Sequence, residues 1–151
     1  MNIATGGGTM LHELVHPMLH ATFPKVPPWF NEGMASLFEQ ARWDDEGNLN
    51  GEVNWRLPGL QEAIATGELP PMSALMAADL ATFYNEDPGC NYGQARYLTY
   101  YLQEHGLLNE ALQALRTEPA DTTAVGSVLG VSSVDAWEQE VWRAWVMELE
   151  D

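Results

Sequence analysis

The chain has very few basic residues: six lysines and arginines stand against 22 aspartates and glutamates, and the formal net charge is −16. Proteins that bind nucleic acids or anionic membrane surfaces use lysine and arginine to neutralise phosphate groups. We therefore expect no nucleic-acid partner and no attachment to an anionic membrane. The acidity either favours basic substrates or serves only to keep the protein soluble.

Cysteine is also nearly absent, because Cys90 is the single one and cannot form an intrachain disulfide. Nothing in the sequence therefore requires an oxidising compartment, and we interpret Cys90 as a loop thiol or a partly buried thiol. No apolar run approaches the roughly 20 residues that cross a membrane, and residues 1–8 lack the features of a signal peptide. We expect no membrane insertion, and the sequence leaves the compartment unknown, with cytoplasmic as the default.

The composition is that of a globular protein, with 46% apolar and 19% charged residues. At 151 residues we expect a single domain, residues 1–151, that can bury a core. Apolar residues mostly recur with helical spacing, so the predicted fold class is mainly α. Beyond the first helix, which carries two histidines, we predict helices over Trp29 to about Arg42, Leu60 to Ala65, Ser73 to Ala77, Tyr92 to His105, Asn109 to Arg116, and onward from Ser132–Asp135 to about Leu149.

Three local patterns refine this prediction. Asn50-Gly51 suggests a tight turn or a small hairpin after the second helix. Ser132 and Asp135 have the spacing of a capping box, which predicts a helix start there. An apolar stripe recurs at every fourth residue of the last helix, at Trp137, Val141, Trp145 and Leu149. We expect this stripe to belong to the core, with a groove for a partner as the alternative.

The most informative stretch is His12–His16, which has the pattern His-Glu-x-x-His. Residues four apart lie on one face of a helix, so His12 and His16 can present two imidazoles to one ion. Glu32 follows in the first turn of the next predicted helix, after a short connection that ends in a Pro27-Pro28 turn. Two imidazoles and a carboxylate suit Zn²⁺ and leave its fourth position open, as in hydrolytic sites. The alternative is that these are unrelated histidines and a solvated acid.

The chain resembles the gluzincin branch of zinc metallopeptidases, in particular the peptidase-MA-like domains of uncharacterised bacterial proteins. The matching stretches are His12–Pro17, Pro28–Glu39 and Tyr92–Leu98. The resemblance extends over most of the chain, but only the first two stretches are specific motifs. It implies a zincin-like helical metallopeptidase domain that acts on a peptide or protein substrate.

The resemblance also implies roles for individual residues. His12, His16 and Glu32 match the zinc ligands, and Glu13 matches the general base. Tyr92 opens a predicted helix at the position from which such enzymes often donate a hydrogen bond in the transition state. Other tyrosines are alternatives for that role, namely Tyr84, Tyr97, Tyr100 and Tyr101.

The chain departs from the family pattern in two ways. Pro17 directly follows His16, and a proline inside a helix removes a hydrogen bond, so we expect a kink there. Zincins also hold their substrate on an edge strand upstream of the metal helix. Only eleven residues precede His12, three of them the consecutive glycines Gly6–Gly8. We therefore expect the upstream β-sheet subdomain to be reduced or absent, unless a second copy or a partner chain completes the cleft or this chain is the C-terminal part of a larger ancestral domain.

In the expected mechanism Glu13 takes a proton from the attacking water and passes it to the leaving amine. Ser36 or Glu39, one and two helical turns beyond Glu32, could orient a ligand histidine, although Glu39 could equally form a plain salt bridge. His20 continues the histidine stripe, so a fourth-ligand role in a resting state is one interpretation. Because it follows Pro17, we expect it instead to lie behind the ligands or to be exposed. We expect a zinc-dependent peptidase, and the alternative is a catalytically silent, zinc-stabilised module that binds a protein partner.

Overall fold

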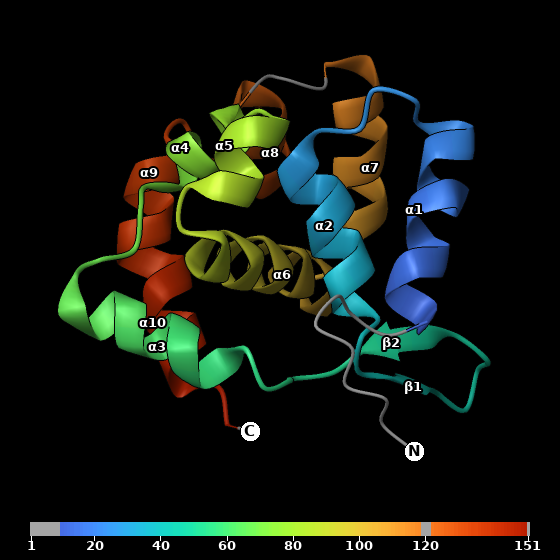
Figure 1. Ribbon diagram of the computed structural model, residues 1–151, viewed down its shortest axis with the longest axis horizontal. Helices are drawn as coiled ribbons and strands as arrows, with labels where there is room; N and C mark the ends of the chain where they lie inside the picture. Colours follow the sequence, from blue (N-terminus) through green and yellow to red (C-terminus); the bar gives the residue numbers. More distant parts are fainter. Residues whose placement is uncertain (1–9, 119–121, 151) are drawn as a thin grey trace.

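A long helix, α6 (Pro88–Glu104), runs through the middle of the fold, and α2 (Pro28–Leu37) packs along it (Figure 1). The structure is a computed structural model that describes residues 10–118 and 122–150. The other elements are α1 (Met10–Thr22), β1 (Ala41–Trp43), β2 (Leu49–Gly51), α3 (Leu57–Thr66), α4 (Met72–Ala77), α5 (Leu80–Asn85), α7 (Leu108–Thr117), α8 (Thr122–Leu129), α9 (Val134–Trp137), the π-helical turn η1 (Glu138–Trp142) and α10 (Arg143–Glu148). The prediction of a mainly α fold is confirmed.

Proline, glycine and aspartate residues mark several of the helix ends. Pro28 occupies the first turn of α2, where its missing N–H costs no hydrogen bond. Gly67, with a φ of 75°, ends α3, and Gly106, with a φ of 69°, follows the end of α6. Asp79 caps α5 by accepting a hydrogen bond from the backbone N–H of Thr82 at 2.8 Å.

The contact between α2 and α6 is the most extensive between two helices of the described chain, and it depends on Gly33. A Cβ at this position would lie 2.7 Å from the carbonyl oxygen of Ala95 and 2.8 Å from the Thr99 methyl group. The hydroxyl of Thr99 also donates a hydrogen bond to the carbonyl oxygen of Gly33 at 3.0 Å. Because only glycine leaves room for this approach, α2 is fixed along α6.

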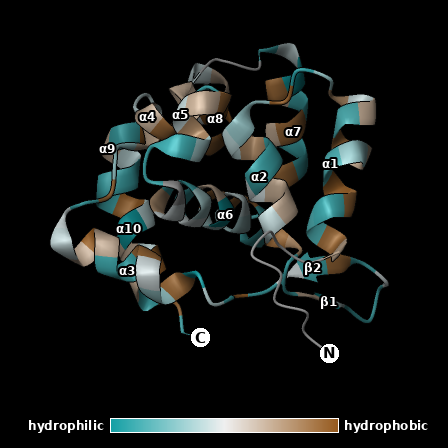
Figure 2. Ribbon diagram, viewed as in Figure 1, coloured by the Kyte–Doolittle hydropathy of each residue, from teal (hydrophilic) through white to brown (hydrophobic). Residues whose placement is uncertain are grey.

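The first helix, α1, lies at the edge of the molecule and packs against α2 (Figure 1). Its buried residues are His12 and Leu19. Three of its apolar side chains are exposed, Met10 at 80%, Leu14 at 50% and Met18 at 71%. Figure 2 shows hydrophobic and hydrophilic segments alternating along this helix. The helix continues through Pro17 to Thr22. Because α1 packs against α2 and most of its apolar side chains are exposed, it contacts the rest of the protein along one side only.

The second helix is shorter than predicted, and the extension from Trp29 to about Arg42 is wrong beyond Leu37. The chain turns there into the antiparallel hairpin β1–β2, in which Ala41 pairs with Gly51. A Cβ on Gly51 would lie 2.5 Å from a methyl carbon of Leu37, so glycine lets β2 close against the end of α2. Gly51 is thus a strand residue, and the turn of the hairpin is built by Asp44, which accepts a hydrogen bond from the backbone N–H of Asn48 at 2.8 Å.

The last helix also differs from the prediction. The π-helical turn η1 adds a residue per turn, so Trp142 enters the core and Val141 is 44% exposed. The rest of the predicted stripe is confirmed, because Trp137 is in the core and Trp145 and Leu149 pack against it. Ser133, not Ser132, caps α9 by accepting a hydrogen bond from Ala136. Asp135 instead accepts hydrogen bonds from Ser73, at 2.7 and 2.6 Å. The prediction also omitted α5 and α8, which are six and eight residues long.

The hairpin is the only sheet within residues 10–118 and 122–150, and it follows the metal segment in the chain. The expected loss of an upstream sheet falls mainly on residues 1–9, which lie outside the described residues. None of the described helices is long and apolar enough to span a membrane.

Candidate metal centre

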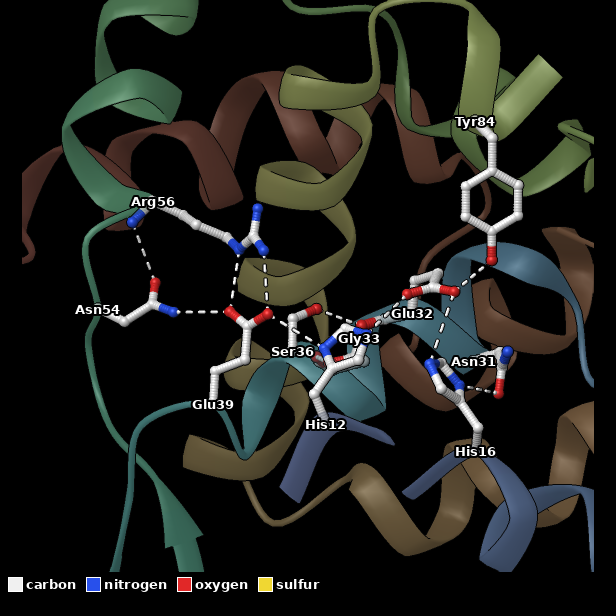
Figure 3. A network of polar contacts seen from close by, with 11 residues as sticks. His12, His16, Asn31, Glu32, Gly33, Ser36, Glu39, Asn54, Arg56 and Tyr84 are labelled. Atoms are coloured by element: carbon white, nitrogen blue, oxygen red, sulfur yellow. Dashed lines mark hydrogen bonds and ion pairs between the residues drawn. The ribbon is translucent and has the colours of Figure 1, made fainter. Parts of the chain in front are cut away.

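His12 and His16 on α1 face Glu32 on α2, and the three side chains could hold a metal ion. One potential ligand atom from each residue lies within 4.8 Å of the other two. Nε2 of His12 is 3.3 Å from Oε2 of Glu32, and Nε2 of His16 is 3.8 Å from Oε1 (Figure 3). Glu32 is only 3% exposed, so it is not the solvated acid of the alternative interpretation.

The spacing of these atoms fits a small, four-coordinate cation. Bonds of about 2.0–2.1 Å in a tetrahedron place neighbouring ligand atoms about 3.3 Å apart. The distance from His12 to Oε2 of Glu32 matches this value, and the distance from His16 to Oε1, the other oxygen of the same carboxylate, is longer. Oε2 of Glu32 is buried, and its ion-pair contact in the described part of the chain is with Nε2 of His12. A buried carboxylate oxygen of this kind is well placed to bind a cation.

The Nδ1 atom of each histidine, on the side of the ring opposite Glu32, contacts a side-chain oxygen. Nδ1 of His16 lies 3.1 Å from the side-chain oxygen of Asn31, which is buried on α2. Nδ1 of His12 lies 3.1 Å from Oε1 of Glu39, whose side chain is completely buried. These contacts direct Nε2 of both rings toward Glu32, as contacts behind metal ligands commonly do.

Of the two residues expected to orient a histidine, Glu39 lies against His12 and Ser36 does not. The hydroxyl of Ser36 donates to the carbonyl oxygen of Glu32 within its own helix. Glu39 also forms an ion pair with Arg56, so both interpretations of this carboxylate hold at once. Asn31 lies in the matching stretch Pro28–Glu39 but received no predicted role, and Arg56 belongs to none of the matching stretches.

The charges of the two carboxylates control the protonation of the site. Burial alone would lower the pKa of His12, but its contacts with Glu32 and Glu39 outweigh this effect and raise the pKa to about 9. Burial would raise the pKa of Glu32, yet the hydrogen bonds from His12 and Tyr84 and the charges of the histidines lower it. Without metal, a proton on His12 therefore takes the place of the cation at neutral pH.

Two tyrosines lie beside Glu32. The hydroxyl of Tyr84, from α5, donates a hydrogen bond to Oε1 of Glu32 (Figure 3). Tyr92, from α6, is half-buried, and its ring centre is 6.3 Å from that of Tyr84. Burial raises the pKa of Tyr92, and Glu32 raises it further by its charge and by a hydrogen bond. The predicted role of Tyr92 stays a prediction, and Tyr84 is a second phenol at the same carboxylate.

The other tyrosines serve the core. The hydroxyl of Tyr97 is bonded to the backbone of Asn54, at 3.1 and 3.2 Å. Tyr101 stacks on His105 with ring centres 3.8 Å apart, and Tyr100 lies against Trp145. These contacts hold their rings in the packing around α6.

Glu13 lies between the two histidines in sequence and is exposed on α1. Burial and the contact with Glu32 raise the pKa of Tyr84 most, and the charge of Glu13 adds to this effect. Glu13 is therefore within electrostatic range of the phenol that touches the metal group. His20, the last histidine on α1, is exposed and does not belong to the group.

Comparisons of the chain with protein-family models, with curated proteins and with solved structures gave no match. What the site can do therefore follows from its own residues.

Proposed function

We propose that this protein is a zinc-dependent metallopeptidase of the gluzincin type, with His12, His16 and Glu32 as the zinc ligands. The observation that carries the proposal is the convergence of two imidazoles and one buried carboxylate from neighbouring helices, with donor atoms within 4.8 Å. Nitrogen donors favour zinc over magnesium or calcium, which prefer oxygen ligands. Three protein ligands leave a fourth position for water or substrate, as in catalytic sites.

When bound, zinc would polarise the peptide carbonyl and lower the pKa of a coordinated water to about 7. Glu13, exposed beside the ligand histidines, would take the proton of the attacking water and give it to the leaving amine. Tyr92, with Tyr84 as the alternative, would donate a hydrogen bond to the carbonyl oxygen as its negative charge develops. Their raised pKa values keep both phenols protonated at neutral pH, as a donor must be.

A second candidate function is a catalytically silent, zinc-stabilised module that binds a protein partner. One observation favours it: a cavity of about 850 Å³ lies between the hairpin and α6, beside Trp43 and Tyr100, and no residue of the metal group lines it. Glu13 favours the enzyme, because a structural zinc site commonly closes all four positions with protein ligands and has no use for a free carboxylate beside them.

Replacing Glu13 by Gln separates the two functions. In an enzyme, Glu13→Gln should retain zinc and fold, and its hydrolysis of a broad peptide library should fall by about 10²–10⁴-fold. Glu110→Gln, the same change at an exposed position on α7, should leave the rate unchanged. Wild-type protein that contains zinc and is as inert as Glu13→Gln would make the module the better account.

A further inference from the structure

We propose that Arg56 is a positioning residue of the metal centre, which fixes the ligand His12 by holding Glu39. Arg56 lies in the connection between the hairpin and α3, 24 residues beyond Glu32, and touches none of the three ligands in the sequence motif. The inference rests on the metal-binding part of the proposed function. The inference adds Arg56, which would position the ligand His12 although it lies outside the stretches that contain the three ligands.

Arg56 and Glu39 form a bidentate ion pair. Nε of Arg56 donates to Oε2 of Glu39 at 3.1 Å, and Nη2 donates to Oε1 at 3.0 Å (Figure 3). The side-chain amide of Asn54 donates to Oε2 at 3.3 Å. With both oxygens held and the side chain completely buried, the carboxylate of Glu39 cannot rotate freely.

A fixed carboxylate in turn fixes the imidazole. Oε1 of Glu39 faces Nδ1 of His12 at 3.1 Å, while Nε2 of the same ring faces Glu32 at 3.3 Å. A proton on Nδ1, directed to Glu39, leaves the lone pair of Nε2 for a metal ion. If Glu39 turned away, the ring of His12 would lose both its preferred tautomer and its orientation.

The guanidinium is itself held by two aromatic rings. Its central carbon lies 5.0 Å from the ring centre of Tyr92 and 5.4 Å from that of Trp55. A planar cation can stack on rings and grip a carboxylate with two parallel bonds, and lysine cannot do both. Arg56 therefore connects His12, through Glu39, with Tyr92, which is predicted to donate to the substrate.

The two ligand histidines differ in where their support comes from. Asn31, which supports His16, precedes Glu32 directly on α2 and is positioned by the same helix. The support of His12 depends instead on Asn54 and Arg56, which belong to a connecting segment outside the ligand helices. A plain salt bridge would stabilise this segment without affecting the metal, and an experiment can separate the two cases.

The experiment uses Arg56→Met in the full chain, because methionine keeps much of the stem and loses the bidentate contact. We expect zinc affinity, measured by competition with a chromophoric chelator, to fall by about 10–100-fold. The visible absorption of the cobalt-substituted protein should shift, while its helical circular dichroism stays that of wild type. Arg42→Met is the matched control, since Arg42 is 79% exposed and pairs only with Glu52 among its charged contacts in the described chain. It should bind zinc and cobalt as wild type does.

Wild-type zinc affinity and an unchanged cobalt spectrum in folded Arg56→Met would overturn the inference, even if its melting temperature fell. Should Arg56→Met not fold, Glu39→Gln tests the same path, because it keeps the side-chain shape and removes the charge. Its zinc affinity should also fall, and wild-type affinity would contradict the inference. A wild-type chain that binds no zinc would contradict the proposed function instead, so the two failures are distinguishable.

Discussion

The two helices that supply the metal ligands are attached to the protein in different ways. Helix α2 lies in the core, where Trp29, Phe30 and Leu37 are at most 1% exposed. Helix α1 packs against α2 at the edge, and of its residues only His12 and Leu19 are buried. Full burial of a large apolar side chain contributes about 1.5–3 kcal/mol, so α2 is the more firmly held. The difference suggests that the fold sets the position of Glu32, and that a bound metal would join α1 to it.

Two phenols lie beside Glu32, and among the changes that test this comparison the removal of one of them should have the largest effect. Tyr92→Phe should lower kcat by about 10²–10³-fold with little change in KM, because the hydroxyl would act only in the transition state. Zinc content and melting temperature should barely change, since the ring packing remains.

The same kinetics on Tyr84→Phe show which phenol acts. Tyr100→Phe is the control, because its ring lies against Trp145, away from the metal group. A larger loss of kcat in Tyr84→Phe than in Tyr92→Phe would assign the role to Tyr84.

The second prediction concerns a variant that disrupts the packing of α2 against α6. Gly33→Val should lower the free energy of unfolding by about 3 kcal/mol, at the upper end of the usual cost of overpacking, because the new side chain meets the backbone of Ala95. Urea unfolding would measure the change. Gly59→Ala is the control, since a Cβ there meets no atom within 4 Å in helix α3 and alanine is the better helix former. Equal stability of the two variants would contradict the packing account.

The third prediction concerns the attachment of α1. Zinc at 100 times its dissociation constant should stabilise the protein by about 2.7 kcal/mol, because it binds the folded state alone. Hydrogen exchange should slow most in α1 if the metal joins this helix to α2, and α6 should respond less. Uniform slowing along the chain, or none in α1, would show that the two helices are not held differently.

The last of these predictions is a pH dependence of the metal-free protein. The pKa of His12 is raised from 6.5 to about 9 in the folded state, so its contribution to stability is complete below pH 6.5 and is lost as pH rises through 9. The melting temperature, measured in the presence of a chelator, should therefore decrease as the pH rises from 6.5 to 9. His12→Gln should remove this part of the dependence of melting temperature on pH.

With zinc present the trend reverses, because the metal must displace the proton of His12 and binds better as pH rises. If the melting temperature of the metal-free protein depends on pH in the same way in wild type and in His12→Gln, the assignment of the proton to His12 is contradicted.

The ligands were predictable from the sequence because their arrangement is local. The four-residue spacing of His12 and His16 fixes a common helix face, and a short connection brings Glu32 back beside them. Tyr84 and Arg56 reach the site by tertiary packing, and no local pattern marks either residue. Six-residue α5, which carries Tyr84, is too short for its periodicity to be recognised.

The fold was predictable to a similar degree. Helix α6 was predicted over Tyr92–His105 and spans Pro88–Glu104, so its end, which Gly106 follows, was predicted within one residue and its start was predicted too late. The end of α2 depends on Gly51 closing against Leu37, a contact between residues that are 14 positions apart. The π-helical turn that brings Trp142 into the core likewise has no marker in the spacing of the apolar residues.

The most direct test of the central claim is the zinc content of the purified chain and of single-histidine variants. Wild type and His20→Ala, which changes the exposed histidine of the same helix, should each bind about one zinc per chain. His16→Ala should lose tight binding while keeping its helical circular dichroism, because three ligands are needed at the site. No uptake by folded wild type at micromolar zinc, or equal uptake by His16→Ala, would contradict a zinc centre formed by His12, His16 and Glu32.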